Sequence, residues 1–337
     1  MNTKETNLYY ISKSNEILSE LPDYVKTYIR SIHNRISART QFGYVKDIQM
    51  FLNYLPSADI EYLKELKQDD FEKYLEHMER YEKNGKIYSN DRASIKRKLS
   101  SLRKFFAYLF TTGMIPADEI RKVEIPKLNK KNIIYLEKDE AADLLKETEK
   151  SRNLTKKEQE YADKQSIRDT AIIYLLLSTG IRVSECAGLD INDIDMNKKN
   201  IRIIRKGGNE DIVYFSDESS EHIQKYLDQR NLIKTADPKE TALFLSSQKK
   251  RMRVRTIEIM VKKHAERAVP LKKITPHKLR ATYATHLYEQ TSDIYLVANA
   301  LGHKDVATTK EYYARMSDRH KEQARNKVNY NKTNENE

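Results

Sequence analysis

Apolar residues recur at every third or fourth position through the first third of the chain. This spacing predicts consecutive amphipathic helices from about residue 22 to residue 110. Turn and capping residues place the starts of four helices near Pro22, Ser37, Gln68 and Asn90. The last of these helices has a continuous apolar face made of Ile95, Leu99, Leu102 and Phe106. We therefore expect a small all-α bundle over residues 20–115.

Turn residues and cations follow this bundle and predict a linker over residues 116–131. Pro116 and Pro126 interrupt the helical pattern, and three lysines follow the second proline: Lys127, Lys130 and Lys131. The boundary between two domains is expected at about residue 130. A length of 337 residues agrees with two domains of about 100–200 residues each.

The second domain, residues 132–330, is predicted to be mixed but mostly helical. A helix is expected over residues 137–150, then a polar stretch through residue 164, and then the most apolar helix, residues 167–179, which Gly180 ends. Two β-branched runs flank the tripeptide Gly207-Gly208-Asn209 and predict an antiparallel hairpin over residues 201–215. Further helices are predicted over residues 219–230, 255–268, 277–290 and 295–301, before a polar tail at 331–337. The expected fold is mainly α with a small antiparallel β-sheet.

The charge of the chain favours a polyanionic partner. Lysine and arginine number 62 against 50 acidic residues, a net charge of +12 at pH 7, which suits nucleic acid first and an anionic membrane surface second. A polar N-terminus and short apolar runs predict a cytoplasmic protein outside the membrane. The single cysteine, Cys186, cannot form an intramolecular disulfide and is expected to be a core thiol.

The scarce glycines lie beside candidate chemistry. Eight glycines supply neither a phosphate-binding loop nor a dinucleotide fingerprint, and no His-Glu-x-x-His pair occurs, so we expect no nucleotide cofactor and no catalytic metal. Gly180 and Gly302 instead end helices just before Arg182 and His303. A glycine in the left-handed conformation can direct the following side chain out of the helical register. Taken alone, each of the two is better explained as a surface cation or a hydrogen-bonded histidine.

Six residues together form a set suited to phosphoryl transfer without metal: Arg182, Lys206, His277, Arg280, His303 and Tyr312. His277 and Arg280 are three residues apart and share one helix face. A guanidinium fits phosphate oxygens, and an imidazole can move a proton near neutral pH. Lys206 lies in the predicted hairpin, and Tyr312 follows His303 by nine residues. In such a set the arginines neutralise the phosphate, the lysine protonates the leaving oxygen and the phenolate attacks.

With these residues the chain resembles the tyrosine recombinases, the phage-integrase family, through both domains. The resemblance rests on four blocks, at residues 179–185, 205–209, 277–280 and 301–312. Within the family the sequence is similar to Xer-type recombinases, particularly the branch that acts as a single protein, the XerS type. Ala281 departs from the histidine that many relatives have after the second arginine, at a position outside the catalytic set.

The resemblance implies a role for each residue of the set. Three residues would contact the scissile phosphate: Arg182, Arg280 and His303. Lys206 would be the general acid, His277 would assist proton transfer at the tyrosine, and Tyr312 would form a 3′-phosphotyrosyl bond. The adjacent Tyr313 is expected to pack. Three further residues in or near these blocks have expected supporting roles: Glu185, Lys278 and His286. Glu185 would orient the first arginine, and helix packing is the alternative for His286.

The resemblance also implies an architecture and partners. The first domain would be the core-binding (SAM-like) domain and the second the catalytic domain, and the two would close around double-stranded DNA. Four copies would act on two DNA sites through a Holliday junction. A helix after Tyr312, roughly residues 318–328, would dock on a neighbouring subunit, and a DNA translocase is a candidate further partner.

Six cations along the fourth N-terminal helix are candidate DNA contacts: Arg92, Lys96, Arg97, Lys98, Arg103 and Lys104. One side of this helix can pack through its apolar face while the other meets phosphates. A charge-rich helix is more often only solvated, but the excess of positive charge favours DNA. The linker lysines would lie near the DNA backbone as well.

Alternative functions stay open beside chromosome dimer resolution. The first alternative is an integrase or excisionase of a phage or conjugative element. Many such integrases have an additional N-terminal domain, whereas only about twenty residues precede the first predicted helix here. A non-catalytic DNA-binding regulator would not need the spacing between His303 and Tyr312. A polybasic membrane-surface protein would need an amphipathic anchor, and the cations are instead dispersed.

Overall fold

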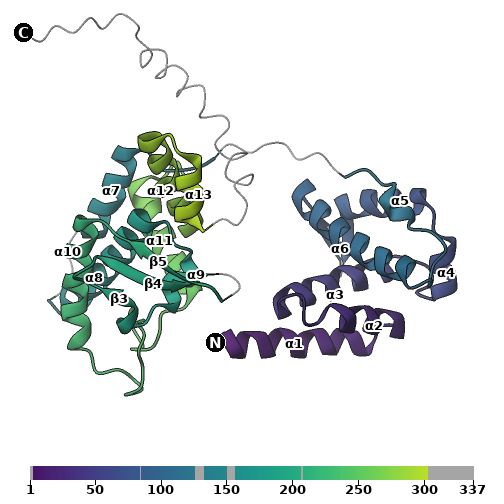
Figure 1. Cartoon of the computed structure of the whole chain (residues 1–337), viewed down its shortest axis with the longest axis horizontal. Coiled ribbons are helices and arrows are strands. Elements are labelled where there is room, and N and C mark those ends of the chain that lie inside the picture. Colours follow the sequence, from purple (N-terminus) through teal and green to yellow (C-terminus); the bar gives the residue numbers. More distant parts are fainter. Residues whose placement is uncertain (1–2, 84, 126–132, 150–155, 206–207, 303–337) are drawn as a thin grey trace, which may run out of the picture. The chain divides into compact units, whose positions relative to one another are not determined.

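The computed structural model describes residues 3–83, 85–125, 133–149, 156–205 and 208–302. The chain divides into two compact units, residues 1–131 and 132–337, and each unit has its own hydrophobic core. Figure 1 shows the helices of the N-terminal unit in purple to blue and those of the C-terminal unit in teal to yellow-green. The expected linker lysines and the polar tail lie outside the described residues.

The N-terminal unit is built from helices. They are α1 (Thr3–Ser19), α2 (Asp23–Ile32), α3 (Ala38–Leu52), α4 (Ile60–Glu65), α5 (Gln68–Glu79) and α6 (Arg92–Thr111), followed by a short 3-10 helix, Glu119–Arg121. The four predicted helices are confirmed as α2, α3, α5 and α6. Ser37 caps α3 by accepting a hydrogen bond from the backbone N–H of Thr40 at 3.2 Å, and Asp91 caps α6 in the same way through Ser94 at 2.9 Å. The sequence analysis did not predict α1, whose apolar residues form no clear stripe, or the six-residue α4.

The core of this unit is aromatic and spans several helices. The rings of Phe51 in α3 and Phe71 in α5 stack with centroids 5.6 Å apart, and Phe106 in α6 meets Phe71 edge-on at 4.9 Å. Each fully buried phenylalanine contributes about 1.5–3 kcal/mol from burial, and such ring pairs add specific geometry. These three side chains therefore fix α3, α5 and α6 against one another.

A two-stranded antiparallel hairpin connects α5 to α6. It consists of β1 (Arg80–Lys83) and β2 (Lys86–Ser89), and Gly85 in its turn has a φ of +70°. The sequence analysis expected only helices here. The strands are four residues long and β2 is exposed throughout, so β2 lacks the alternation of buried and exposed positions that marks a strand in a sequence.

The C-terminal unit combines seven described helices with a small sheet. The helices are α7 (Lys138–Glu149), α8 (Lys156–Thr179), α9 (Val183–Gly188), α10 (Asp217–Asn231), α11 (Val254–Ala268), α12 (Pro276–Thr291) and α13 (Ile294–Leu301). The sheet has the order β3 (Ile194–Asp195), β4 (Asn200–Ile204), β5 (Glu210–Tyr214), all antiparallel. The predicted hairpin is confirmed as β4 and β5, and the expected mainly α fold with a small antiparallel sheet is confirmed as well.

The helix α8 contributes many core residues to this unit and ends next to the candidate site. Its residues 171–176 are all buried. The predicted polar stretch through residue 164 is wrong in part, because α8 already begins at Lys156. Lysine, glutamate, glutamine and alanine in residues 156–165 are good helix formers without an apolar stripe, so hydrophobic spacing could not reveal this start. Within the described part of the chain, no helix is long and apolar enough to span a membrane.

Candidate active site

The turn between α8 and α9 requires glycine. Gly180 has a φ of +61°, a left-handed conformation that favours glycine. A Cβ atom at this position would also overlap the ring of Tyr283, which packs against the turn from α12. The chain can therefore leave α8 sharply, and Arg182 comes to lie at the start of α9.

Glu185 holds Arg182 in place. One carboxylate oxygen accepts a hydrogen bond from Nη1 of Arg182 at 2.8 Å, and the other accepts from the Arg182 backbone N–H at 2.7 Å. The Arg182 side chain remains 36% exposed, whereas Glu185 is buried. The expected orientation of the first arginine by Glu185 is thus present, with part of the guanidinium open to solvent.

Arg280 lies against the same turn from α12. Its side chain is buried, and its guanidinium donates hydrogen bonds to the backbone carbonyls of Gly180 and Leu301. Gly180 directly follows α8, and Leu301 is the last residue of α13. Arg280 therefore joins the α8–α9 turn, which precedes Arg182, to the end of α13.

A second buried arginine, Arg205, reaches the same end of α13 from β4. Its Nε donates to Asp211 of β5 at 2.9 Å, and its Nη2 donates to the carbonyl of Ala300 at 3.1 Å. Its Nη1 lies 3.5 Å from Glu185, the partner of Arg182. Gly302 leaves room for this guanidinium, because a Cβ there would lie 2.7 Å from Nε of Arg205.

Arg205 had no assigned role in the sequence analysis. An arginine beside a lysine and two glycines has the sequence signature of a surface turn. Two features of the sequence could have indicated a role for Arg205. Arg205 directly precedes Lys206, and a glycine, a residue type that is scarce in this chain, directly precedes His303.

His277 lies in the first turn of α12, near both phosphate-binding candidates. Partial burial lowers the pKa of its imidazole below the ordinary value, and the positive charges of Lys278, Arg280 and Arg182 lower it further. A lowered pKa keeps the ring neutral at neutral pH, so that it can accept a proton. The structure thus brings together Arg182, His277 and Arg280, three of the six predicted residues.

The other three predicted residues lie outside the described part of the chain: Lys206, His303 and Tyr312. The same holds for Tyr313. The residues directly before Lys206 and His303 are described: Arg205 and Gly302, which are in contact through the guanidinium described above. Among the described residues, no group of three or more His, Cys, Asp and Glu side chains is arranged to hold a metal ion.

Two other residues near the motif blocks make packing contacts. Cys186 is buried, and burial raises the pKa of its thiol to about 12, which confirms the expected core thiol. The ring of His286 in α12 meets Tyr135 edge-on with centroids 6.4 Å apart, a packing contact with the segment before α7.

The candidate DNA contacts of α6 have differing environments. Arg97 forms two hydrogen bonds of 2.7 Å with Asp47 of α3, and Arg103 donates to the carbonyl of Val123. Lys104 donates to the hydroxyl of Tyr44 at 2.8 Å, and Lys98 donates to the side-chain oxygen of Asn90 at 3.1 Å. Two more are exposed: Arg92 and Lys96. Intramolecular contacts thus hold several of these cations in defined positions on the unit.

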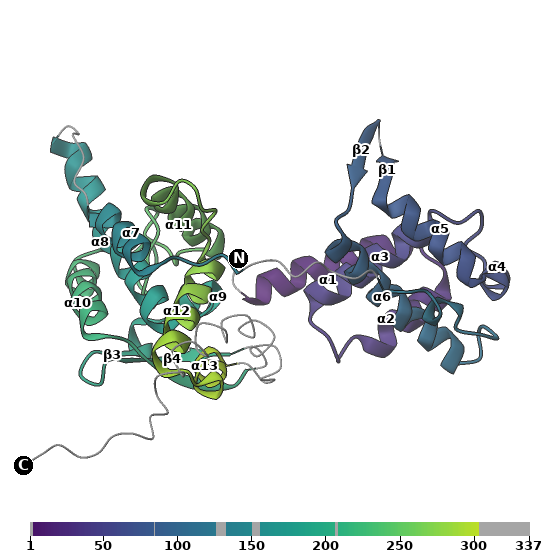
Figure 2. The same ribbon diagram turned by 90° about the horizontal axis from the view of Figure 1, so that it is seen from above.

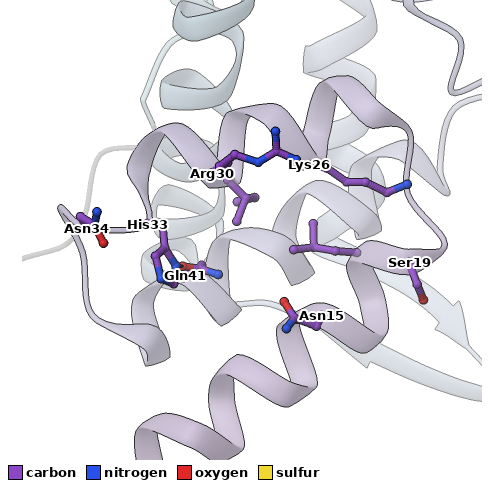
Figure 3. Close-up of a pocket in the computed structure, with 9 residues that line it drawn as sticks. Asn15, Ser19, Lys26, Arg30, His33, Asn34 and Gln41 are labelled. Atoms are coloured by element: carbon purple, nitrogen blue, oxygen red, sulfur yellow. Dashed lines mark hydrogen bonds between the residues drawn. The ribbon is translucent and has the colours of Figure 1, made fainter.

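A cavity of about 500 Å³ opens among α1, α2 and α3 of the N-terminal unit (Figure 3). Its polar lining includes Lys26, Arg30 and a hydrogen-bonded pair, His33 and Gln41, with 2.9 Å between Nδ1 and Oε1. None of the lining residues is one of those predicted to carry chemistry. The cavity belongs to the helical unit, whereas Arg182, His277 and Arg280 belong to the C-terminal unit.

Two arginines and a histidine with a lowered pKa lie close together in a mainly helical chain of two units. Side chains of these types can bind a phosphodiester. Comparison with known protein families agrees with a site of this kind. Residues 134–320 match the phage integrase family, and residues 25–113 match the phage integrase N-terminal SAM-like domain. The chain belongs to the phage integrase family and is a site-specific DNA recombinase of the tyrosine type.

Individual relatives carry the Xer names. Tyrosine recombinase XerC of Vibrio cholerae serotype O1 is 30% identical over 277 residues, which cover 82% of each chain. Tyrosine recombinase XerD of Shewanella oneidensis is 32% identical over 277 residues, covering 82% of this chain and 86% of the relative.

Solved structures agree in fold. The Tn1549 transposon integrase in complex with transposon right end DNA has a TM-score of 0.68 at 18% identity, covering 90% of this chain and 99% of that one. The XerH site-specific recombinase in a post-cleavage complex with palindromic difH substrate has a TM-score of 0.66 at 17% identity, covering 94% of both chains.

Proposed function

We propose that this recombinase cleaves DNA by attack of the Tyr312 hydroxyl on the scissile phosphate. A bond forms between the tyrosine oxygen and phosphorus, and the bond from phosphorus to the 5′-oxygen breaks, which leaves a 3′-phosphotyrosyl link. Lys206 donates the proton that the 5′-oxygen takes up, and His277 accepts the proton of the phenol. Attack by a 5′-hydroxyl of another strand reverses these steps, so that bond energy is conserved and no nucleotide is consumed.

One observation carries this proposal. Arg280 donates a hydrogen bond to the carbonyl of Gly180, two residues before Arg182, although the two arginines are 98 positions apart in the sequence. Their charges also act together on the pKa of His277. Two guanidinium groups held in this way can neutralise the non-bridging oxygens as negative charge develops in the transition state. His303 supplies a further hydrogen bond to the phosphate.

We further propose that the N-terminal unit is the core-binding domain, over residues 20–115, with residues 116–131 as the linker to a catalytic domain over residues 132–330. The cations of α6 contact the DNA backbone in this scheme. Solved structures that share the fold include a lambda integrase tetramer bound to a Holliday junction, and we propose that four copies of the present chain likewise act on two double-stranded sites.

The biological role that we propose is resolution of chromosome dimers in the cytoplasm, as in Xer systems, with one recombinase acting alone and a DNA translocase as a candidate regulator. The two Xer-named relatives over 82% of the chain favour this role. Integration or excision of a mobile element is the second candidate, because the Tn1549 transposon integrase shares the fold.

A nicked suicide duplex tests the chemistry and the role together. The nick lets the cleaved fragment escape, so a covalent adduct accumulates and is seen on a denaturing gel. We expect an adduct on the host's replication-terminus site. Tyr312→Phe should abolish it and leave DNA affinity within about twofold, because only the attacking oxygen is lost.

Tyr313→Phe is the matched control and should form the adduct at the rate of the unaltered protein. An adduct that persists in Tyr312→Phe and disappears in Tyr313→Phe would move the nucleophile by one residue. An adduct on the ends of a neighbouring mobile element, and not on the terminus site, would assign the protein to element integration.

A further inference from the structure

The hairpin of β1 and β2 presents two chemically different faces. Figure 2 shows it projecting from the helices of the N-terminal unit. Tyr81 pairs with Tyr88, and Glu82 pairs with Ile87. Successive side chains of a strand point to opposite faces, so Lys86 shares the face of Tyr81 and Tyr88, whereas Ile87 lies on the other. We call the first of these the tyrosine–lysine face.

Contacts with α6 and its N-terminal cap region hold this face in place. The rings of Tyr81 and Tyr88 stack with centroids 5.6 Å apart and an interplanar angle of 18°. Nζ of Lys98 in α6 lies 5.9 Å from the centre of the Tyr81 ring. Asn90 accepts from that lysine at 3.1 Å and donates to the carbonyl of Met78 at 2.8 Å. The tyrosine–lysine face therefore continues the surface of α6.

Positive charge is concentrated in this part of the unit. Residues 80–98 include seven lysine and arginine residues and two acidic ones. Burial lowers the pKa of Lys98, and the neighbouring cations Arg97 and Lys46 act in the same direction, although Asp47 opposes them. Lys86 and the exposed phenol of Tyr88, with Lys98 beside Tyr81, complement a polyanion with regularly spaced phosphates.

We propose that the tyrosine–lysine face contacts the phosphate backbone of duplex DNA and extends the DNA-binding surface of α6. Lys86 and the hydroxyl of Tyr88 donate to phosphate oxygens, while the Tyr81 stack and Lys98 support them. Contacts of this kind position the protein along the duplex without reading its sequence. The inference rests on the proposed DNA recombinase function and adds a surface that lies outside the predicted α6 contacts.

The test uses the full-length protein with Lys86→Ala and Tyr88→Ala. Ile87→Ala is the matched control, because Ile87 lies between these residues, points to the opposite face and is 65% exposed. Binding is measured by fluorescence anisotropy at several salt concentrations, on a duplex that the unaltered protein selects from a random pool. Circular dichroism melting checks that each variant folds.

Lys86→Ala should weaken binding about three- to tenfold and lower the slope of log affinity against log salt by about 0.9, the value for one phosphate contact. Tyr88→Ala should weaken binding severalfold with little change in slope, because it removes no charge. Ile87→Ala should bind within about twofold of the unaltered protein.

An unchanged salt slope in Lys86→Ala would overturn the inference. So would loss of multi-copy assembly on DNA in Ile87→Ala alone, which would make the hairpin a protein contact. Adduct formation by the unaltered protein on the suicide duplex tests the recombinase function separately. If the unaltered protein selects no duplex from the pool, both proposals are refuted, and no variant is needed to see this.

Discussion

At the scale of single residues, Arg205 connects three parts of the candidate site. Its guanidinium contacts Asp211 across the hairpin, Glu185 in α9, and the carbonyls of Ala300 and Leu301 at the end of α13. The backbone of Arg205 also closes the turn, because its N–H donates to the carbonyl of Asn209 at 2.8 Å. A guanidinium with several fixed partners immobilises its own backbone. We therefore expect Arg205 to position the root of the hairpin that carries Lys206.

Arg205→Gln should slow single-turnover DNA cleavage about 10- to 100-fold and change DNA affinity less than about twofold, because a displacement of about 1 Å in a catalytic group can cost 10²-fold. A substrate with sulfur in place of the 5′-bridging oxygen tests whether this loss of rate arises through the general acid. A thiolate leaves without a proton, so it does not need the general acid. Cleavage of this substrate by Arg205→Gln and by Lys206→Ala should approach the normal rate.

Arg230→Gln is the control for a purely structural loss. Arg230 is also buried in this unit and also donates to backbone carbonyls, those of Ala242 and Glu240. Its substitution should change the cleavage of the two substrates equally. Equal losses on both substrates in Arg205→Gln, with rescue of Lys206→Ala, would show that Arg205 does not act through the general acid.

At the scale of elements, a buried carboxylate joins α3 to α6. Asp47 accepts two hydrogen bonds from Arg97 and one from the buried hydroxyl of Ser101, all at 2.7 Å. Asp47→Ala should lower the free energy of unfolding by about 2–3 kcal/mol, because charged hydrogen bonds are lost and a buried hydroxyl loses its partner. Half of the Arg97 side chain reaches solvent, which keeps the loss below that of a fully buried pair.

Urea denaturation of the full chain measures this change. Asp69→Ala is the control, since Asp69 pairs with Lys73 on the exposed side of α5 and both side chains are mostly in solvent. It should change stability little. Equal effects of the two substitutions would mean that the Asp47 contacts do not couple α3 to α6.

The same elements show which structure the sequence can predict. β4 and β5 could be predicted because β-branched residues alternate beside glycines, and Ile201, Ile203 and Val213 are buried on one face. β1 and β2 could not be, because a hairpin without a buried face leaves no periodic pattern. The start of α8 was placed too late for the same reason. An apolar stripe in the sequence reveals that a helix is present. The polar ends of a helix form because their residues have a high helix propensity, and they show no apolar stripe.

The candidate site shows a similar limit. Arg182, His277 and Arg280 could be predicted as a set from residue type, spacing and resemblance. The meeting of Arg182 and Arg280 at the Gly180 turn depends on tertiary contacts between distant segments, and the sequence alone does not contain these distances. Arg205 was missed because burial, and not residue type, separates it from a surface cation. Lys206 and Tyr312 remain predictions that the proposed experiments test, and His303 remains a prediction.

At the scale of the whole molecule, each of the two units has its own core. The core of residues 1–131 is centred on aromatic side chains of α3, α5 and α6, and that of residues 132–337 includes the buried segment of α8. Chains with two separate cores do not in general unfold in one cooperative step. We therefore expect two thermal transitions in differential scanning calorimetry of the full chain.

Substitutions in each core assign the transitions. Asp47→Ala should lower the midpoint of one transition by several degrees, and Arg230→Gln should lower the other, because each removes buried polar contacts within a single unit. Duplex DNA that binds the folded chain should raise the transitions of the units that contact it. A single transition that both substitutions shift equally would mean that the two cores unfold together. In that case, DNA binding at the N-terminal unit would also stabilise the segments that hold Arg182 and Arg280.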